Sequence, residues 1–204
     1  ATREHLQAAW GSIEGERYWL QLRGFDVPDR KTLRGSIGHS HVLGPELRSF
    51  GGMRAVLFKL LAKAAMRLRH EGYLAGGMAI RIRFVGSDRR FERDLHFAPL
   101  DDTPSLLRLL GDNLQTLQKA IHEGRWNPKR HPPLSVATTL TRLEPALGVS
   151  AELIPECMRA KTMSAVLDRI NLRYGNNAVY FGAMQEALAR GAAPMRIPFS
   201  TIPD

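Results

Sequence analysis

The sequence predicts an α+β fold: a four-stranded sheet in the order β-α-β-β-α-β with both helices on one face. A short helical segment precedes it and a small α/β tail follows it. One observation is the strict alternation in residues 78–85, where Ile80, Ile82 and Phe84 share one face of a half-buried strand. The other is the helical spacing of apolar residues in two segments that flank a hairpin. Two helices on one face leave the other face of the sheet bare.

The four strands are predicted as follows. Residues 34–43 form the first, with Ile37 and Leu43 toward the core. After residues 78–85, a turn at 86–88 leads into a returning strand over 89–97. Arg93 would share the core face of that strand, so we expect a β-bulge or a changed register there. The fourth strand spans 134–141, with Val136, Thr138 and Leu140 inward and Ser135, Ala137, Thr139 and Thr141 outward.

Two helices are predicted to cover the sheet. The first spans 53–70, where the apolar stripe is Leu57, Leu60, Leu61, Ala64 and Leu68. The second begins at Asp102 or Thr103, a good cap residue followed by Pro104, and ends at Gly124. A basic loop over 125–130 follows it.

The flanks differ from this centre. Residues 1–33 form short helical pieces broken at Gly11 and Gly15, and they resemble the end of an upstream helical domain followed by a tether. Residues 144–204 form the tail, with a helix over 162–174, a turn leading into 178–181, a short helix over 183–190 and a terminal strand over 195–199.

Charge places the binding surface in the middle of the chain. The net charge is +9, and residues 34–143 hold 18 Lys and Arg against 9 Asp and Glu, whereas both flanks are neutral. This predicts a polyanionic partner. We expect no membrane association, because there is neither an interfacial amphipathic helix nor an 18-residue apolar run. A single cysteine, Cys157, excludes an internal disulfide and fits a cytoplasmic protein.

The bare face of the sheet is the predicted binding site. Five arginines lie within the thirteen residues from Arg81 to Arg93. By alternation, Arg81 and Arg83 lie on the bare face together with the small hydroxyl residues Ser36, Ser135 and Thr139. This face holds no aromatic residue, so it is suited to phosphate-backbone contact rather than base stacking, which disfavours an RNA-binding domain. The predicted contact residues are Arg34, Ser36, Gly38, Arg81, Arg83, Arg89, Arg90, Ser135 and Thr139.

Three short motifs, in order, resemble the C-terminal part of Y-family translesion DNA polymerases of the impB/mucB/samB type. Residues 34–38, Arg-Gly-Ser-Ile-Gly, resemble the Lys-Ser-Ile-Gly strand that opens the little finger domain. Residues 17–26 resemble the end of the thumb and its tether, and residues 168–175 resemble the Asp-x-Ile/Leu-Asn-x-Arg-Tyr/Phe-Gly helix near the end of many such bacterial proteins. Many members have a Glu and a Thr close behind the first motif, where Ser40 and Val42 stand here.

The resemblance implies a DNA-binding module for damage bypass that grips template-primer duplex. It divides the chain into a thumb end and tether (1–33), a little finger (34–143) and a C-terminal extension (144–204). The family's chemistry is nucleotidyl transfer with two Mg²⁺ ions held by palm carboxylates. That palm precedes the thumb, so we expect this chain to be inactive alone, without a cofactor.

No catalytic or metal-binding residue is assigned. The Asp101-Asp102 pair is better explained as a helix cap, and His39 and His41 share a strand face without a supporting ligand. The alternative function is a non-catalytic repair adaptor whose tail binds another repair protein. The segment 185–188 weakly resembles a sliding-clamp peptide, but it lacks the trailing aromatic pair.

Overall fold

The chain forms two compact units, residues 1–33 and 34–204, in a computed structural model. The structure describes residues 2–28, 35–88, 90–147, 155–175 and 177–192, and describes 155–157 by their backbone alone. Among these residues no helix is both long and apolar enough to cross a membrane.

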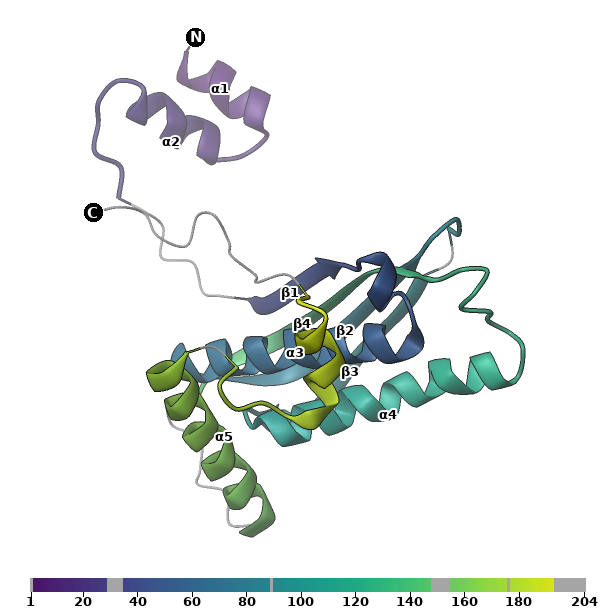
Figure 1. The fold of residues 1–204 in the computed structure, drawn as a ribbon. Helices are drawn as coiled ribbons and strands as arrows, with labels where there is room; N and C mark the ends of the chain where they lie inside the picture. The colour runs from purple at the N-terminus through teal and green to yellow at the C-terminus, as the bar shows by residue number, and fades with distance from the viewer. Residues whose placement is uncertain (1, 29–34, 89, 148–154, 176, 193–204) are drawn as a thin grey trace. The chain divides into compact units, whose positions relative to one another are not determined.

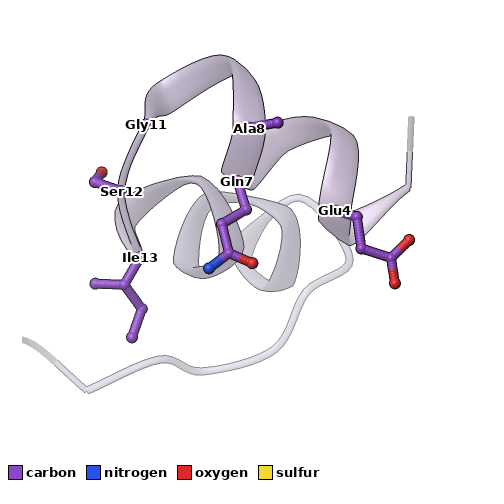
Figure 2. A pocket seen from close by; sticks show the side chains of 6 residues that line it. All are labelled: Glu4, Gln7, Ala8, Gly11, Ser12 and Ile13. Atoms are coloured by element: carbon purple, nitrogen blue, oxygen red, sulfur yellow. The ribbon is translucent and has the colours of Figure 1, made fainter.

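The first unit is a pair of eight-residue helices, α1 (Arg3–Trp10) and α2 (Glu14–Gln21). Gly11 ends α1 at a positive φ of 62°, as the sequence predicts. Gly15 does not break the helix but lies inside α2, where a Cβ would come within 2.2 Å of the Leu6 carbonyl oxygen, so it permits close helix contact. This unit has an open hollow of about 340 Å³. Figure 2 shows the residues that line it, Glu4, Gln7, Ala8, Gly11, Ser12 and Ile13.

The second unit contains an antiparallel sheet in the order β1-β4-β2-β3. Its strands are β1 (Ser36–Val42), β2 (Tyr73–Phe84), β3 (Arg90–Leu100) and β4 (Pro133–Pro145). A 3₁₀ turn, η1 (Pro45–Leu47), leads into α3 (Phe50–His70), which covers one face of the sheet together with α4 (Thr103–His122) (Figure 1). The predicted fold class is confirmed.

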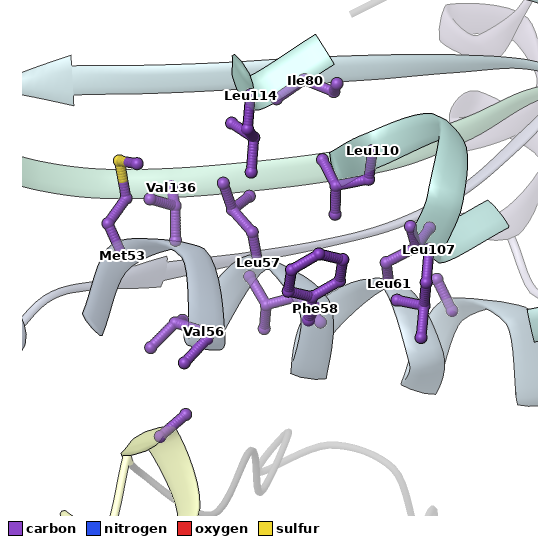
Figure 3. Close-up of a cluster of buried hydrophobic side chains, with 14 of the residues drawn as sticks. Met53, Val56, Leu57, Phe58, Leu61, Ile80, Leu107, Leu110, Leu114 and Val136 are labelled. Atoms are coloured by element: carbon purple, nitrogen blue, oxygen red, sulfur yellow. The ribbon is translucent and has the colours of Figure 1, made fainter. Parts of the chain in front are cut away.

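The core lies between this helix pair and the sheet. Figure 3 shows Leu57 and Leu61 of α3 and Leu110 of α4 gathered with Ile80 and Val136 of the sheet. All five side chains are at most 1% exposed. One cluster therefore contains the apolar stripe predicted for residues 53–70 together with the inward strand residues Ile37, Ile80, Ile82, Phe84, Val136 and Leu140.

Capping side chains explain where the helices begin. The Ser49 hydroxyl accepts a hydrogen bond from the Gly52 amide at 2.9 Å, which starts α3 three residues earlier than the apolar stripe indicates. The Asp102 carboxylate accepts from the Ser105 amide at 2.8 Å, so Asp102 is the predicted cap of α4. β2 begins five residues before its predicted start. Its first residues, including Gly76 and Gly77, are buried without alternation, so the sequence pattern does not reveal them as part of the strand.

The prediction of a β-bulge or a changed register at Arg93 is wrong. The β2–β3 register runs without a shift from Gly77↔His96 to Arg83↔Arg90, and the irregularity lies between Ala75 and Gly77. Arg93 pairs with Ile80 on the helix side of the sheet, but β3 is an edge strand. The guanidinium of Arg93 stays exposed there and lies 5.3 Å from the centre of the Phe91 ring.

The tail adds α5 (Pro155–Tyr174), a 3₁₀ turn η2 (Gly182–Met184) and α6 (Gln185–Ala189) to the second unit. Asp168 of α5 forms a two-pronged ion pair with Arg69 of α3, at 2.7 and 2.9 Å. Residues 178–181, where we expected the β part of the tail, form no strand. The Asn171 amide side chain satisfies the backbone of Val179 instead, at 3.0 and 3.1 Å. The predicted strand over 195–199 lies outside the described residues.

Candidate nucleic-acid interface

The sheet face opposite α3 and α4, which we call the open face, is a grid of four cross-strand rows. Residues directly opposite each other in a sheet share a face, so the register defines each row. Along the strands the rows are Ser36–Thr141–Gly77–His96, Gly38–Thr139–Ala79–Asp94, Ser40–Ala137–Arg81–Glu92 and Val42–Ser135–Arg83–Arg90. The open face thus brings together Ser36, Gly38, Arg81, Arg83, Arg90, Ser135 and Thr139, all predicted from sequence. Arg34 and Arg89 lie outside the described residues.

The last row places two guanidinium groups directly opposite each other. Arg83 of β2 and Arg90 of β3 are cross-strand partners, and both are exposed. Within the described part of the chain neither forms an ion pair with a carboxylate. Like charges directly opposite each other destabilise a sheet, and an anion bound between them would reverse that repulsion.

Arg81 has different surroundings. Its Nε lies 3.9 Å from a Glu92 oxygen and its Nη2 lies 3.6 Å from an Asp94 oxygen. Strand alternation predicts Arg81 as a contact residue but does not reveal these two acidic neighbours on β3. Their carboxylates offset its charge, so the positive potential of the open face is concentrated in the row of Arg83 and Arg90.

A basic loop between α4 and β4 reaches the same end of the sheet (Figure 1). The amide of Val85, just after β2, donates to the Pro132 carbonyl at 2.9 Å. The Trp126 ring packs 4.9 Å from the Phe84 ring, and its indole N–H donates to the His131 carbonyl at 3.1 Å. These contacts fix the loop beside the β2–β3 turn.

The tip of this loop presents two exposed cations, Lys129 and Arg130. The Asn127 side-chain oxygen accepts hydrogen bonds from both of their backbone amides, at 2.9 and 3.4 Å, which sets the turn. The basic residues of 125–130 predict a loop, but not its position beside this end of the sheet. The signal was Trp126, since a large aromatic ring in a polar loop requires a packing partner.

Small residues keep the middle of the open face flat. A Cβ on Gly38 would come within 2.5 Å of the Thr139 hydroxyl oxygen, and one on Gly77 within 2.6 Å of the Thr141 hydroxyl oxygen. Each threonine side chain therefore leans over a glycine on the neighbouring strand. This arrangement exposes hydroxyl groups on a low surface that a phosphate backbone can approach closely.

Arg142 adds a cation that strand alternation does not predict on this face. It is exposed and has a φ of 53°, a conformation that is uncommon outside glycine. Its Cδ lies 3.5 Å from the position of a Cβ on Gly77, so the side chain crosses the first row of the open face. The only sequence signal is the pair Gly76-Gly77 within a strand, which is typical of a bulge or a close approach.

The other candidate ligands lie away from this face. Asp102 caps α4, while burial raises the pKa of the neighbouring Asp101 despite the opposing charges of Lys161 and Arg69. His39 and His41 share the helix side of β1, as predicted, next to lysines and Arg67. Across the described ranges, no three His, Cys, Asp or Glu side chains gather closely enough to hold a metal ion.

The geometry defines a helix-backed antiparallel domain with a cationic end on its open face. The profile of the impB/mucB/samB family C-terminal domain matches residues 34–153, so the chain belongs to this family. This finding confirms the resemblance in the sequence.

The other comparisons are more distant. A Y-family DNA polymerase chimera, Dbh-Dpo4-Dbh, is 13% identical over 70% of this chain, with a TM-score of 0.43. An insertion ternary complex of Dbh DNA polymerase is 12% identical over 69%, with a TM-score of 0.41. The matched part covers 38% of the length of each of these proteins. The search of curated proteins finds no match.

Proposed function

We propose that the sheet domain is the DNA-binding little finger of a translesion DNA polymerase and that it holds template-primer duplex mainly through phosphates. The observation that carries this proposal is the opposed pair Arg83 and Arg90 on the open face. The Trp126-anchored loop presents Lys129 and Arg130 at the same end of the sheet. Four cations, two on the open face and two on the adjoining loop, gather at one end of the sheet and form an electrostatic footprint suited to a phosphate backbone.

The rest of the open face favours backbone contact over base reading. Its four rows contain no Phe, Tyr or Trp side chain, and His96 at the edge is the one ring among them, so a row of stacking platforms for successive unpaired bases is missing. The proposal therefore expects little sequence preference. The sequence-predicted residues other than Arg81 remain its contact set, extended by Lys129, Arg130 and Arg142. Arg81 is left out because Glu92 and Asp94 offset its charge.

The remainder of the activity is proposed from family membership. We assign nucleotidyl transfer with two Mg²⁺ ions to carboxylates outside this chain, so that the chain by itself would bind DNA without extending a primer. From the same membership we propose a role in the bypass of damaged DNA, and from the single cysteine we propose a cytoplasmic location.

A salt titration tests the duplex proposal. Anisotropy of a labelled primer-template, measured at several salt concentrations, should give a log–log slope of about −0.9 per phosphate contact. R83A/R90A should reduce the magnitude of that slope by about 1.8. The control is R108A/R169A, which removes two exposed cations from helices. A flat salt response, or equal effects of the two double variants, would overturn the proposal.

The adaptor function is the second candidate, and the exposed apolar side of α5 favours it. Leu172 and Tyr174 are each 68% exposed and Met158 is 54% exposed. The clamp-like segment 185–188 is less suited to this role, because Ala187 is buried in the core and Leu188 packs against it. If the L172S/Y174S variant still captures a purified sliding clamp, α5 is not the docking element.

A further inference from the structure

A second group of basic side chains lies on the helix side of the sheet, where α3 passes beside the edge strand β1. Lys59, Lys63 and Arg67 are spaced four residues apart, so they form one stripe of α3 with steps of about 6 Å along the axis. His39 and His41 of β1 face this stripe. We call these five residues the α3 ledge.

The electrostatic neighbours show which groups of the ledge meet. The pKa of His39 is lowered to about 4, mainly by burial and to a smaller extent by the charges of Lys63 and Arg67. The pKa of His41 is lowered mainly by burial and then by the charge of Lys59. The pKa of Lys59 is lowered mainly by burial and then by the charge of Lys63. Cations therefore influence one another along the whole ledge, even though Arg67 pairs with Glu71 at 2.8 Å and Lys59 donates to the Ala192 carbonyl at 3.1 Å. Such a field favours an anion and disfavours a metal ion.

Two buried polar atoms lie beneath the ledge. His39 and Thr138 are cross-strand partners, and Thr138 is fully buried. Neither the His39 Nε2 nor the Thr138 Oγ1 has a hydrogen-bond partner within the described part of the chain. Protonating His39 would bury an unpaired N–H as well as adding a charge, so the imidazole is neutral when no anion is bound. Its charge state is therefore sensitive to an anion on the ledge.

The side chains around the ledge distinguish nucleic acid from protein as the ligand. Among the described residues of α3, no large apolar side chain is exposed. The ledge therefore lacks an apolar side chain that a protein partner could bury on binding. Its regular steps of about 6 Å are comparable with the spacing of phosphates along a flexible nucleic-acid strand.

We propose that the α3 ledge is a second nucleic-acid site, which binds the phosphate backbone of a single strand on the face of the sheet opposite to the duplex site. Lys59, Lys63 and Arg67 contact successive phosphates, and His39 and His41 line the β1 side. The inference is independent of the duplex proposal, because the two sites share no residue and face opposite sides of the sheet.

The test uses the full chain with a twelve-nucleotide oligothymidylate, which cannot form a duplex. Adding it should shift the imidazole NMR signals of His39 and His41 and raise their pKa values, because bound phosphates offset the neighbouring cations. K59Q/K63Q should reduce the magnitude of the salt slope for this oligonucleotide by about 1.4, or about 0.7 for each lost contact. K59R/K63R keeps the charges and should restore the slope.

The controls separate the two proposals. R83A/R90A should leave the oligothymidylate-induced shifts of His39 and His41 unchanged while it weakens duplex binding. Melting curves of K59Q/K63Q check that the variant is folded. Unshifted histidine signals, or a wild-type salt slope in K59Q/K63Q, would overturn the inference. Shifts produced by poly-glutamate but not by oligothymidylate would also overturn it, in favour of an acidic protein partner.

Discussion

At the scale of single residues, Arg81 and Arg83 are equivalent in the sequence but not in the structure. Arg81 has Glu92 and Asp94 within 4 Å, whereas Arg83 faces Arg90. We therefore expect R83A to reduce the magnitude of the duplex salt slope by about 0.9, and R81A to change it far less. Anisotropy titrations of the two single variants at matched salt concentrations measure this difference.

The complementary variant gives an effect of opposite sign. E92Q/D94N removes the two carboxylates that offset the Arg81 charge, so it should tighten duplex binding and steepen the salt slope. Weaker binding by this variant, or equal losses in R81A and R83A, would show that Arg81 contacts DNA despite its acidic neighbours.

His39 provides a prediction about pH. Burial, then Lys63 and Arg67 of α3, lowers its pKa from 6.5 to about 4; His41 lies on the same side of β1, and Thr138 of β4 is uncharged. Above pH 6.5 the ring is neutral in both the folded and the unfolded chain. As the pH falls from 6.5 toward 4, the unfolded chain takes up the proton first, so the free energy of unfolding decreases.

The expected size of this loss is roughly 1–2 kcal/mol between pH 7 and pH 4.5, less than full linkage because the ring is partly exposed. Urea denaturation at both pH values measures it. H39Q cannot take up this proton, so its unfolding free energy should depend less on pH. If H39Q and the original chain show the same pH dependence, another group is responsible.

Residue faces could be predicted from the sequence, whereas residue partners could not. Alternation alone identified the burial of Ile80, Ile82 and Phe84 and the exposure of Arg81 and Arg83. It carries no information on which strand lies alongside, and that neighbour decides whether an arginine meets Glu92 or Arg90. The left-handed backbone of Arg142 is also invisible, because no glycine or asparagine marks it.

At the scale of elements, the central strand β2 carries both the core and the open face. Ile82 is fully buried between the helices and the sheet, while its neighbour Arg83 is exposed. I82A should lower the free energy of unfolding by roughly 2–5 kcal/mol, because it removes buried aliphatic carbons from the core and leaves a cavity. R83A should change it by less than about 0.5 kcal/mol.

Chemical denaturation and DNA titration together decide this prediction. I82A should bind duplex with normal affinity wherever it is still folded, whereas R83A should melt normally and bind more weakly. The reverse pattern would mean that β2 presents its other face to DNA.

The limits of sequence reasoning at this scale follow from what holds each element. The two helices that cover the sheet were located well, because their apolar stripes and the Asp102 cap are local signals. The tail helix α5 begins at Pro155, seven residues before its predicted start. Residues 178–181 were misjudged because the Asn171 side chain, rather than a strand, satisfies their backbone. The link between the basic loop and the sheet depends on Trp126 meeting Phe84, which are 42 positions apart in the chain.

At the scale of the whole molecule, the two units have very different interiors. The described core cluster draws every member from the second unit, from Ile37 to Ala192. In the first unit, the residues of α1 and α2 are partly or fully exposed, apart from Gly15. Each of these helices has eight residues, and isolated helices shorter than about 12–15 residues are marginal in water.

These interiors predict that residues 35–204 fold without the first unit. The shortened chain should keep the melting temperature of the full chain within about 4 °C, since a loss of 1 kcal/mol corresponds to about 2–4 °C for a domain of this size. A peptide of residues 1–33 should show little helical circular dichroism, because its helices have no core to stabilise them. Thermal melts of both chains and a far-ultraviolet spectrum of the peptide measure these outcomes. A drop of about 10 °C or more in the shortened chain would show that residues 1–33 stabilise the sheet domain directly.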